Sequence, residues 1–212
     1  MEFLKVLLPM LFRGLKVTLL ISVAGILFGF LIGSISGYAL QGKNKIAKFI
    51  ADVYIWIIRG TPLIVQALYV YYVVPILFDT DLSSLAAGII VISLNSGAFI
   101  SEIVRGALQA VDSGQNEAGL SLGLTNKQIL WHIIIPPAFK LMLPSLFNQF
   151  IITVKDTAIL SVIVVNEITK EIQNFAALSF KTIEAYSAGA LFYLVIISVL
   201  IIIQKNIEKK LR

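Results

Sequence analysis

The chain has 212 residues, of which 58% are hydrophobic and only 14% are charged. A soluble domain averages about 25% charged residues, so this chain has too few to cover a surface that faces water. The net charge of +5 does not indicate a nucleic-acid partner, because the basic residues lie between apolar runs rather than in one stripe. The chain has no cysteine, which excludes disulfides and thiolate metal sites. These features predict a membrane protein.

The N-terminal segment MEFLKVLLPMLFRGLKVTLL lacks a small-residue cleavage site after a short apolar core, so we expect it to be retained. Lys5, Arg13 and Lys16 punctuate its apolar residues at loosely helical spacing. This pattern predicts an amphipathic helix that lies at the membrane interface.

Apolar runs then predict an all-α membrane protein with about five transmembrane helices in a single domain, residues 1–212. Each run approaches or exceeds the ~20 residues that cross ~30 Å of hydrocarbon at ~1.5 Å per residue. Thr61-Pro62 is expected to bend the second helix near its cytosolic end. The approximate spans are 17–40, 53–78, 83–108, 141–165 and 185–205.

The first span carries a glycine at every fourth position, Gly25, Gly29, Gly33 and Gly37. Residues four apart share one side of a helix, so these glycines form a seam. Small residues let helix backbones approach closely in membranes. We therefore expect close helix packing along the seam, for example at a subunit contact.

Charges between the spans predict the orientation of the chain. Gln41–Lys48 carries three lysines, Lys205–Arg212 is basic, and the loop before the fourth span adds Lys127, whereas the DTDLSS segment after the second span is acidic. Five spans with the N-terminus outside place every basic segment, and the C-terminus, in the cytoplasm. Residues 166–184 are then external, and their apolar spacing indicates a short surface helix.

The cytosolic loop of residues 113–137 contains EAGLSLGLTNKQILWHIIIPP and no catalytic constellation. Gly123 fits the left-handed residue that ends one helix, and Thr125 with Gln128 forms a capping-box pattern that begins a second. We expect Pro136-Pro137 to stop the second helix. The resulting helix pair fits two roles, resting on lipid headgroups or other spans, or docking into a groove of a soluble partner.

The same loop resembles the EAA signature, E-A-A-x3-G-x9-I-x-L-P, of ABC importer permeases. In this signature Gly119 stands for the third-position alanine, and Ile135 for the leucine. RGTPLIVQ (59–66), SGAFISEIVRGA (96–107) and VKDTAILSVI (154–163) are similar to the polar amino-acid uptake subfamily (histidine, arginine and glutamine type), so the resemblance covers nearly the whole chain. The matching signature residues are Glu117, Ala118, Gly119, Gly123, Ile133 and Pro136.

This resemblance implies a type I ABC importer permease, a multi-pass protein of the bacterial cell membrane that pairs with a second permease copy, as a homodimer in preference to a heterodimer. It implies a cytosolic ABC ATPase dimer whose grooves receive the 113–137 helices, and an extracytoplasmic amino-acid-binding protein. The chain lacks G-x-x-x-x-G-K-[ST], so ATP and magnesium belong to the ATPase. We therefore expect a transport subunit without a cofactor, not an enzyme. The only histidine, His132, has no partner ligands, so we expect no metal site.

Polar residues at bilayer depth are candidates for a substrate pathway, because charged types cost roughly 2.5–3.5 kcal/mol on insertion scales. Asn95 and Glu102 share one helix face, and Gln149, Thr153 and Asp156 form a second stripe on the next span. We expect the two stripes to line a shared cavity. The candidate pathway residues are Gln66, Asn95, Ser96, Glu102, Gln149, Thr153, Asp156 and Thr157.

Each candidate also has a structural alternative. Asn95 and Gln66 fit interhelical hydrogen bonds, and the serines of the third span fit small-residue packing. Glu102 fits a local ion pair with Arg105, three residues on. Asp156 fits a salt bridge that fixes the fold.

The leading hypothesis is the permease subunit of an ATP-driven importer of polar amino acids. Asp156 and Glu102 near the pathway, with Asp79 and Asp81 outside, favour cationic substrates such as arginine, histidine or lysine, unless these carboxylates pair with arginine or lysine side chains of the chain itself. The alternative is an ion-coupled amino-acid carrier or channel subunit that works without an ATPase. Such a carrier has no use for a cytosolic docking loop. An intramembrane enzyme lacks the necessary Ser–His or paired-Asp arrangement.

Overall fold

The computed structural model describes residues 2–211 and is helical without strands over that range. Four helices are long and apolar enough to cross a membrane, and one bent pair makes a fifth if it counts as a single span. This confirms the all-α membrane fold with about five spans. The elements are α1 (Glu2–Gln41), α2 (Lys45–Gly60), α3 (Leu63–Leu68), η1 (Tyr69–Val73), α4 (Val74–Phe78), α5 (Ser84–Gln109), α6 (Ser113–Ser121), α7 (Asn126–Ile129), η2 (Leu130–Ile134), α8 (Ile135–Asp156), η3 (Thr157–Ile163), α9 (Ile168–Ser179) and α10 (Thr182–Leu211).

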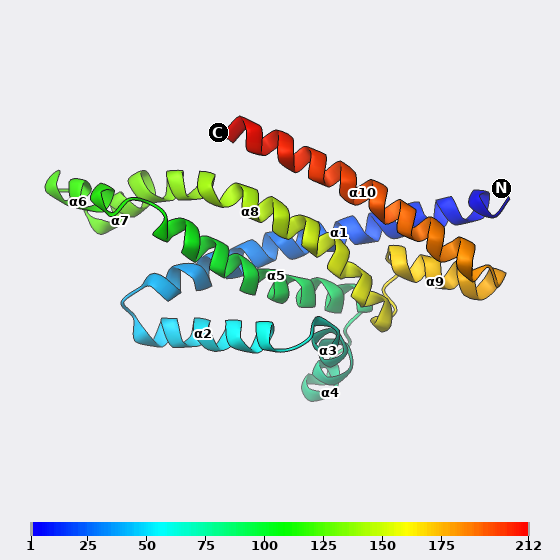
Figure 1. Cartoon of the computed structure of the whole chain (residues 1–212). Helices are drawn as coiled ribbons and strands as arrows, with labels where there is room; N and C mark the ends of the chain where they lie inside the picture. Colours follow the sequence, from blue (N-terminus) through cyan, green and yellow to red (C-terminus); the bar gives the residue numbers. More distant parts are fainter. Residues whose placement is uncertain (1, 212) are drawn as a thin grey trace.

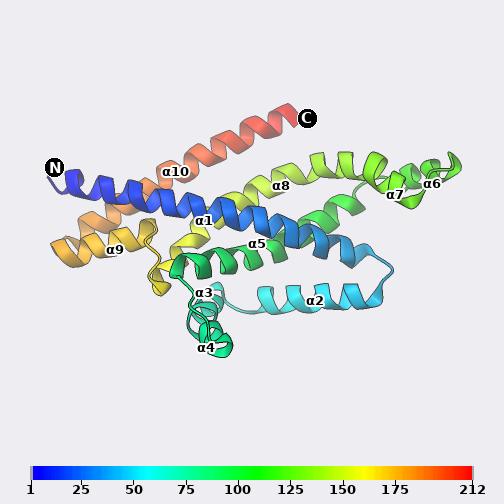
Figure 2. The same cartoon turned by 180° about the vertical axis from the view of Figure 1, so that it is seen from behind.

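The long helices lie roughly along one axis, with α1, α5 and α10 running in one direction and α2 and α8 in the other (Figures 1 and 2). The turn between α1 and α2, the α6–α7 pair and the C-terminal end of α10 all lie toward the same end (Figure 1). These are the segments whose basic residues predicted the orientation. Their grouping agrees with the predicted topology, although which end faces the cytoplasm stays a prediction.

The centre of the molecule is the contact between α1 and α5, where the glycine seam lies. A Cβ added at Gly33 would lie 2.8 Å from the carbonyl oxygen of Gly97, and one at Gly37 would lie 2.5 Å from that of Ser101. The two backbones therefore touch, as small-residue seams allow. The seam predicted from the sequence packs inside the chain, rather than at a subunit contact.

The prediction of a separate amphipathic helix at the N-terminus is wrong. Residues 2–41 form one continuous helix, and Leu7 and Leu11 are almost fully buried against α9 and α10. Pro9 lies inside the helix, within its first turns, and does not interrupt it. The apolar side of the N-terminal segment thus packs on protein, which replaces the lipid interface that we expected.

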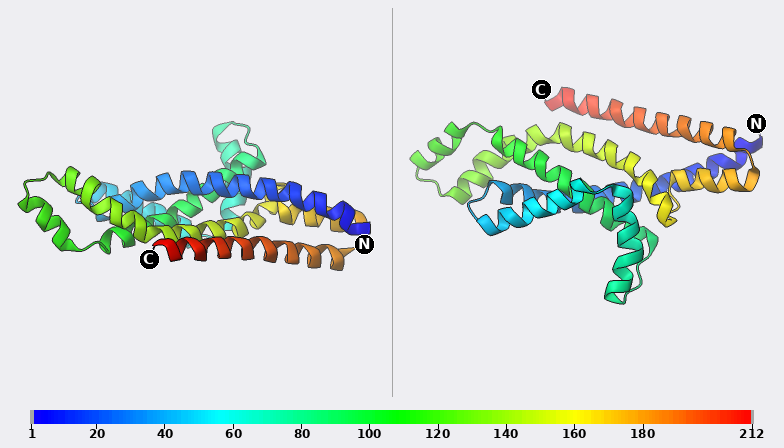
Figure 3. Two further views of the ribbon diagram at one scale, coloured as in Figure 1. Left: turned by 90° about the horizontal axis from the view of Figure 1, so that it is seen from above. Right: turned by 60° about the horizontal axis from the view of Figure 1, so that its bottom comes forward.

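The second predicted span is broken rather than merely bent. α2 ends at Gly60, and the segment Leu63–Phe78 leaves it at 104°. Thr61 has extended backbone angles, as expected for a residue before proline, and Pro62 cannot donate a hydrogen bond to continue the helix. The result is an arm, α3 to α4, that projects sideways from the bundle (Figure 3).

The prediction that Pro136-Pro137 stops a helix is also wrong. A π-helical turn, η2, lies directly before α8, and the two prolines occupy the first turn of α8. Proline is tolerated in a first turn, and a π-turn absorbs the changed hydrogen-bond pattern. The chain therefore runs as one helical rod from Asn126 to Ile163.

The predicted fourth span, 141–165, ends differently from expectation. After Asp156 the chain tightens into the 3-10 helix η3, and Val164 adopts a left-handed conformation with φ 62°. The short helix expected within 166–184 is confirmed as α9. Ile168 and Ile172 on α9 are buried against α1 and α10, so α9 packs within the fold.

Candidate functional site

The loop that matches the EAA signature folds as predicted at its turn. Gly123 has φ 77°, the left-handed conformation that an L-residue with a side chain rarely adopts. Two residues later, Thr125 Oγ1 accepts from the Gln128 backbone at 3.4 Å, and Gln128 Oε1 accepts from the Thr125 backbone at 2.9 Å. This reciprocal pair is the capping box expected from the sequence, and it begins α7.

Gly119 fixes the angle between α6 and the following helix. It is buried, and an added Cβ would lie 2.8 Å from Ile129 Cγ1 and 3.3 Å from Ile133 Cδ1. The signature has alanine at this position, and glycine instead leaves room for the side chain of Ile129, which is only 1% exposed. The signature residues Gly119 and Ile133 therefore lie together and hold the helix pair.

The remaining signature residues lie on the surface of the helix pair. Glu117, Ala118 and Pro136 are exposed. Around them Leu122 and Trp131 expose 79% and 58% of their surface. The pair projects beyond the end of the bundle (Figure 3), so these apolar side chains have no cover within the described residues. Such a projecting apolar surface suits contact with another protein.

One predicted pathway residue of α5, Ser96, meets the α8 stripe, whereas the Asn95–Glu102 stripe does not. Ser96 Oγ and Thr153 Oγ1 lie 3.1 Å apart, and both side chains are almost fully buried. Gln149 and Thr157, one turn to each side of Thr153, are buried as well. Thr157 Oγ1 donates to the carbonyl of Val154 at 2.8 Å. The α8 stripe is therefore buried from Gln149 to Thr157 except at Asp156, and it touches α5 at Thr153.

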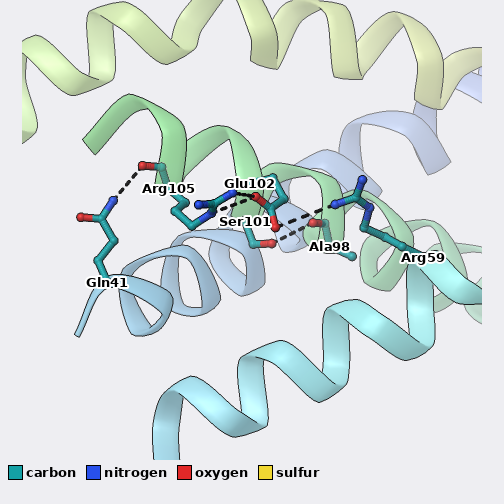
Figure 4. A network of polar contacts seen from close by, with 6 residues as sticks. All are labelled: Gln41, Arg59, Ala98, Ser101, Glu102 and Arg105. Atoms are coloured by element: carbon teal, nitrogen blue, oxygen red, sulfur yellow. Dashed lines mark hydrogen bonds and ion pairs between the residues drawn. The ribbon is translucent and has the colours of Figure 1, made fainter. Parts of the chain in front are cut away.

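Glu102, in contrast, lies on the side of α5 that faces α2. Its Oε2 accepts from Arg105 Nη2 at 2.6 Å and from Arg105 Nε at 2.9 Å, which confirms the local ion pair (Figure 4). Its Oε1 lies 3.8 Å from Nη1 of Arg59 on α2. Gln41 caps this network by donating to the Arg105 carbonyl at 2.7 Å. The structure thus does not bring Glu102 to the Ser96–Thr153 contact.

Gln66 closes the break between α2 and α3. Its Nε2 donates to the carbonyl of Ile58 at 2.7 Å, and to the carbonyl and hydroxyl oxygens of Thr61 at 3.1 and 2.9 Å. Carbonyls that the end of α2 leaves without a helical partner are satisfied in this way. The Oε1 atom of Gln66 is buried and has no hydrogen-bond partner among residues 2–211.

The two remaining candidates are placed apart from these contacts. Asn95 is buried on α5. Asp156 is half-buried at the end of α8, and no ion pair joins it to another described residue. Its neighbour Lys155 lines an apolar groove that α8 forms with Tyr193 and Leu194 of α10.

Sequence reasoning missed a polar pocket between α8 and α10. The pocket is open and has a volume of about 470 Å³. Gln204 Nε2 donates to Glu208 Oε1 at 2.9 Å on its α10 side. Helical spacing from Gln149 would have found Ser145, but only the tertiary contact with α10 reveals the rest. The lining residues are Ile103, Pro144, Ser145, Asn148, Gln149, Gln204 and Glu208.

Comparison with known proteins agrees with this geometry. Residues 25–212 match the family described as binding-protein-dependent transport system inner membrane component, and the chain belongs to this family. It is 42% identical to the glutamine transport system permease protein GlnP of Escherichia coli (strain K12), over 96% of this chain and 94% of that one. It is 31% identical to the arginine transport system permease protein ArtQ of Bacillus subtilis (strain 168), over 96% and 93%.

Solved structures share the fold. The crystal structure of an amino acid ABC transporter with histidines matches with a TM-score of 0.90 and 33% identity, over 99% of both chains. The methionine ABC transporter MetNI in an inward-facing conformation matches with a TM-score of 0.82, over 96% of both chains, but at 18% identity it supports the fold alone. The type I ABC permease fold predicted from the sequence is confirmed.

The chain is therefore a membrane permease subunit of a bacterial ABC importer, a transport component rather than an enzyme. A permease of this family works with an ATPase and with a binding protein. Both kinds of partner were expected from the sequence.

Proposed function

We propose that this permease carries a polar amino acid across the membrane, along the contact between α5 and α8. The observation that carries the proposal is the Ser96–Thr153 pair, which places hydroxyl groups from two candidate spans 3.1 Å apart. The polar pocket begins at Gln149, one helical turn from Thr153, and leads toward the end of the molecule that bears the α6–α7 pair. Glutamine and arginine permeases among the relatives support an amino acid as the cargo.

A neutral polar amino acid such as glutamine is the first candidate. Glu102 was one of the two carboxylates near the pathway that favoured a cationic substrate, and it lies between two arginines. A carboxylate that is already paired has little attraction left for a substrate ammonium or guanidinium group. The 42% identity to a glutamine permease supports the same choice.

A cationic amino acid is the second candidate, and Asp156 favours it. This carboxylate ends α8, inside a candidate span, and makes no ion pair with another described residue. A substrate cation at this position would offset the cost of the buried charge. Arginine is named as the cargo of one relative.

The helix pair of residues 113–137 is proposed to couple the permease to the ATPase. Gly119 and Ile133 hold the pair together, Gly123 shapes its turn, and the exposed apolar side chains of the pair face outward. The proposal is that each pair docks in a groove of an ATPase subunit, which binds ATP and magnesium. Two permease copies, as a homodimer, would then dock on two ATPases.

Competitive uptake tests the cargo. Proteoliposomes would contain this chain with its ATPase, with binding protein outside and ATP inside. Uptake of labelled glutamine, competed by unlabelled glutamine, arginine, histidine, lysine or glutamate, ranks the candidates. Competition by glutamine alone supports the neutral cargo, and competition by the basic amino acids supports the cationic one. ATP-independent uptake would instead support an ion-coupled carrier and contradict the proposal.

A further inference from the structure

Arg59 is a cation whose charge the chain does not fully neutralise. It precedes the last residue of α2, directly before the break. Its Nη1 lies 3.8 Å from Glu102 Oε1, which is beyond hydrogen-bond distance, while the other oxygen of Glu102 is held by Arg105. Two guanidinium groups thus share one carboxylate. Within residues 2–211, none of the five N–H donors of Arg59 makes a hydrogen bond, and its side chain is 45% exposed.

The Arg59 side chain also lies within the membrane-spanning part of the fold. Its Cζ atom lies 5.3 Å from the ring centroid of Phe99. Phe99 is three residues from Ser96 on α5, which corresponds to about 4.5 Å along the helix axis. A charged group at this depth is costly unless it faces a water-filled path or a partner. Figure 4 shows Arg59 reaching from α2 across to α5.

The backbone around Arg59 is held in place by Gln66. This side chain donates to the carbonyl of Ile58 on one side of Arg59 and to Thr61 on the other. The break therefore presents the arginine from a fixed position. In many transporters, broken helices near the bilayer midplane carry the substrate site, because their unpaired ends supply polar groups there.

We propose that Arg59 binds the α-carboxylate of the transported amino acid, an inference that rests on the proposed function. The planar guanidinium matches a carboxylate through two parallel hydrogen bonds. Among the described residues the distant oxygen of Glu102 is the only anionic partner of Arg59, and a substrate carboxylate displaces that loose contact without breaking a hydrogen bond. Every α-amino acid carries this group, so Arg59 holds the constant part of the substrate while other residues select its side chain.

Binding to the purified permease–ATPase complex tests this inference without the binding protein. The probes are L-glutamine and L-arginine, each compared with its α-carboxamide, which lacks the negative charge. The wild-type complex should prefer each acid over its amide by about 10- to 100-fold, the range for a hydrogen bond to a charged group. Arg59→Gln should remove this preference, Arg59→Lys should keep part of it, and Arg13→Gln on exposed α1 surface should leave it unchanged.

The outcomes separate the inference from the proposed function. If the wild-type complex binds neither amino acid, the proposed function is contradicted. If it binds one and Arg59→Gln keeps the acid-over-amide preference, only the role of Arg59 is contradicted. If Arg59→Gln lowers the affinity for the acid and the amide equally, the role of Arg59 is also contradicted. That result would indicate that Arg59 binds another anion, such as a lipid phosphate. If Arg59→Gln fails to assemble with the ATPase, Arg59→Lys takes its place in the test. A reduced preference of this variant for the acid over the amide supports the role of Arg59, and an unchanged preference contradicts it.

Discussion

The hydroxyl oxygens of Ser96 and Thr153 lie 3.1 Å apart, and they join α5 to α8 in a part of the bundle from which solvent is excluded. A buried hydroxyl without a partner is costly, so each residue satisfies the other. We infer that this contact fixes the two spans that flank the substrate path. The same contact therefore positions the polar groups of the proposed path.

Thr153→Val should weaken that contact while keeping the shape of the side chain. Interhelical hydrogen bonds in membranes average about 0.6 kcal/mol, so we expect a small loss of thermal stability in detergent. Amino-acid uptake should fall several-fold because α8 is less well positioned, while assembly with the ATPase is unchanged. Thr153→Ser, which keeps the hydroxyl, is the matched control. Full uptake by Thr153→Val would show that the contact is dispensable.

Gly123→Val should uncouple the permease from its ATPase. Left-handed backbone costs an L-residue roughly 1–2 kcal/mol, and more when it is β-branched. The turn between α6 and α7 should therefore reshape, although the spans insert normally. Co-purification of the ATPase measures the effect. Gly106→Ala, at a helical site where an added Cβ meets nothing within 4 Å, is the control. Undiminished ATPase binding by the valine variant would contradict the docking role.

Gly33→Val should disrupt the contact between α1 and α5. Its Cβ would lie 2.8 Å from the Gly97 carbonyl oxygen and from Ile100 Cβ, and backbone cannot yield as a flexible side chain can. Overpacking of this kind typically costs about 1–3 kcal/mol. The melting temperature of the detergent-solubilised chain should fall markedly more than for Gly106→Ala. Equal melting temperatures would mean that the seam is not closely packed in the membrane.

Glu167, between η3 and α9, should make stability depend on pH. The carboxyl is fully buried, and burial raises its pKa from 4.5 to about 7, although hydrogen bonds from the Thr169 and Lys170 backbones oppose the rise. The protonated form is the one that the fold favours, so stability is greatest below pH 4.5 and is lost as the pH rises toward and through about 7. That interval corresponds to roughly 3 kcal/mol.

Thermal melting of the purified protein between about pH 5 and pH 8 measures this dependence. The wild type should melt at a higher temperature at the acidic end. Glu167→Gln should flatten the slope, even though the variant melts lower overall. The glutamine amide loses one acceptor oxygen, either the one for the Lys170 backbone or the one shared by the Thr169 backbone and the Tyr193 hydroxyl. A wild-type slope that persists in the glutamine variant would assign the pH dependence to other groups.

Much of the fold follows from local signals in the sequence. Gly123 and the Thr125–Gln128 capping box were predictable because each is set by neighbours within three residues. The glycine seam on α1 was predictable because its residues are spaced four apart. That α5 packs against the seam was not predictable, because the spacing identifies a face of the helix but not the element that covers it. Pro136-Pro137 misled because a π-turn before them, which no simple sequence pattern marks, lets the helix continue.

The candidate site was harder to predict, because helical spacing identifies a face of a helix but not the element that packs against it. Helical spacing grouped Asn95 with Glu102 and expected them to face α8. The direction of a face depends on how α5 is rotated against its neighbours, and the glycine seam on α1 sets that rotation. Glu102 consequently faces Arg59 of α2. Residues that meet only through tertiary contact, such as Gln149 and Gln204, lie 55 positions apart and share no sequence pattern.

The most direct test of the central claim is amino-acid-stimulated ATP hydrolysis by the complete complex. This chain would be co-expressed with its ATPase, reconstituted in liposomes, and assayed with binding protein and each of glutamine, arginine, histidine and glutamate. We predict that one polar amino acid raises the hydrolysis rate, and that the Gly123→Val variant abolishes the stimulation. Hydrolysis that no amino acid stimulates in a fully assembled complex would contradict the assignment of this permease to amino-acid import.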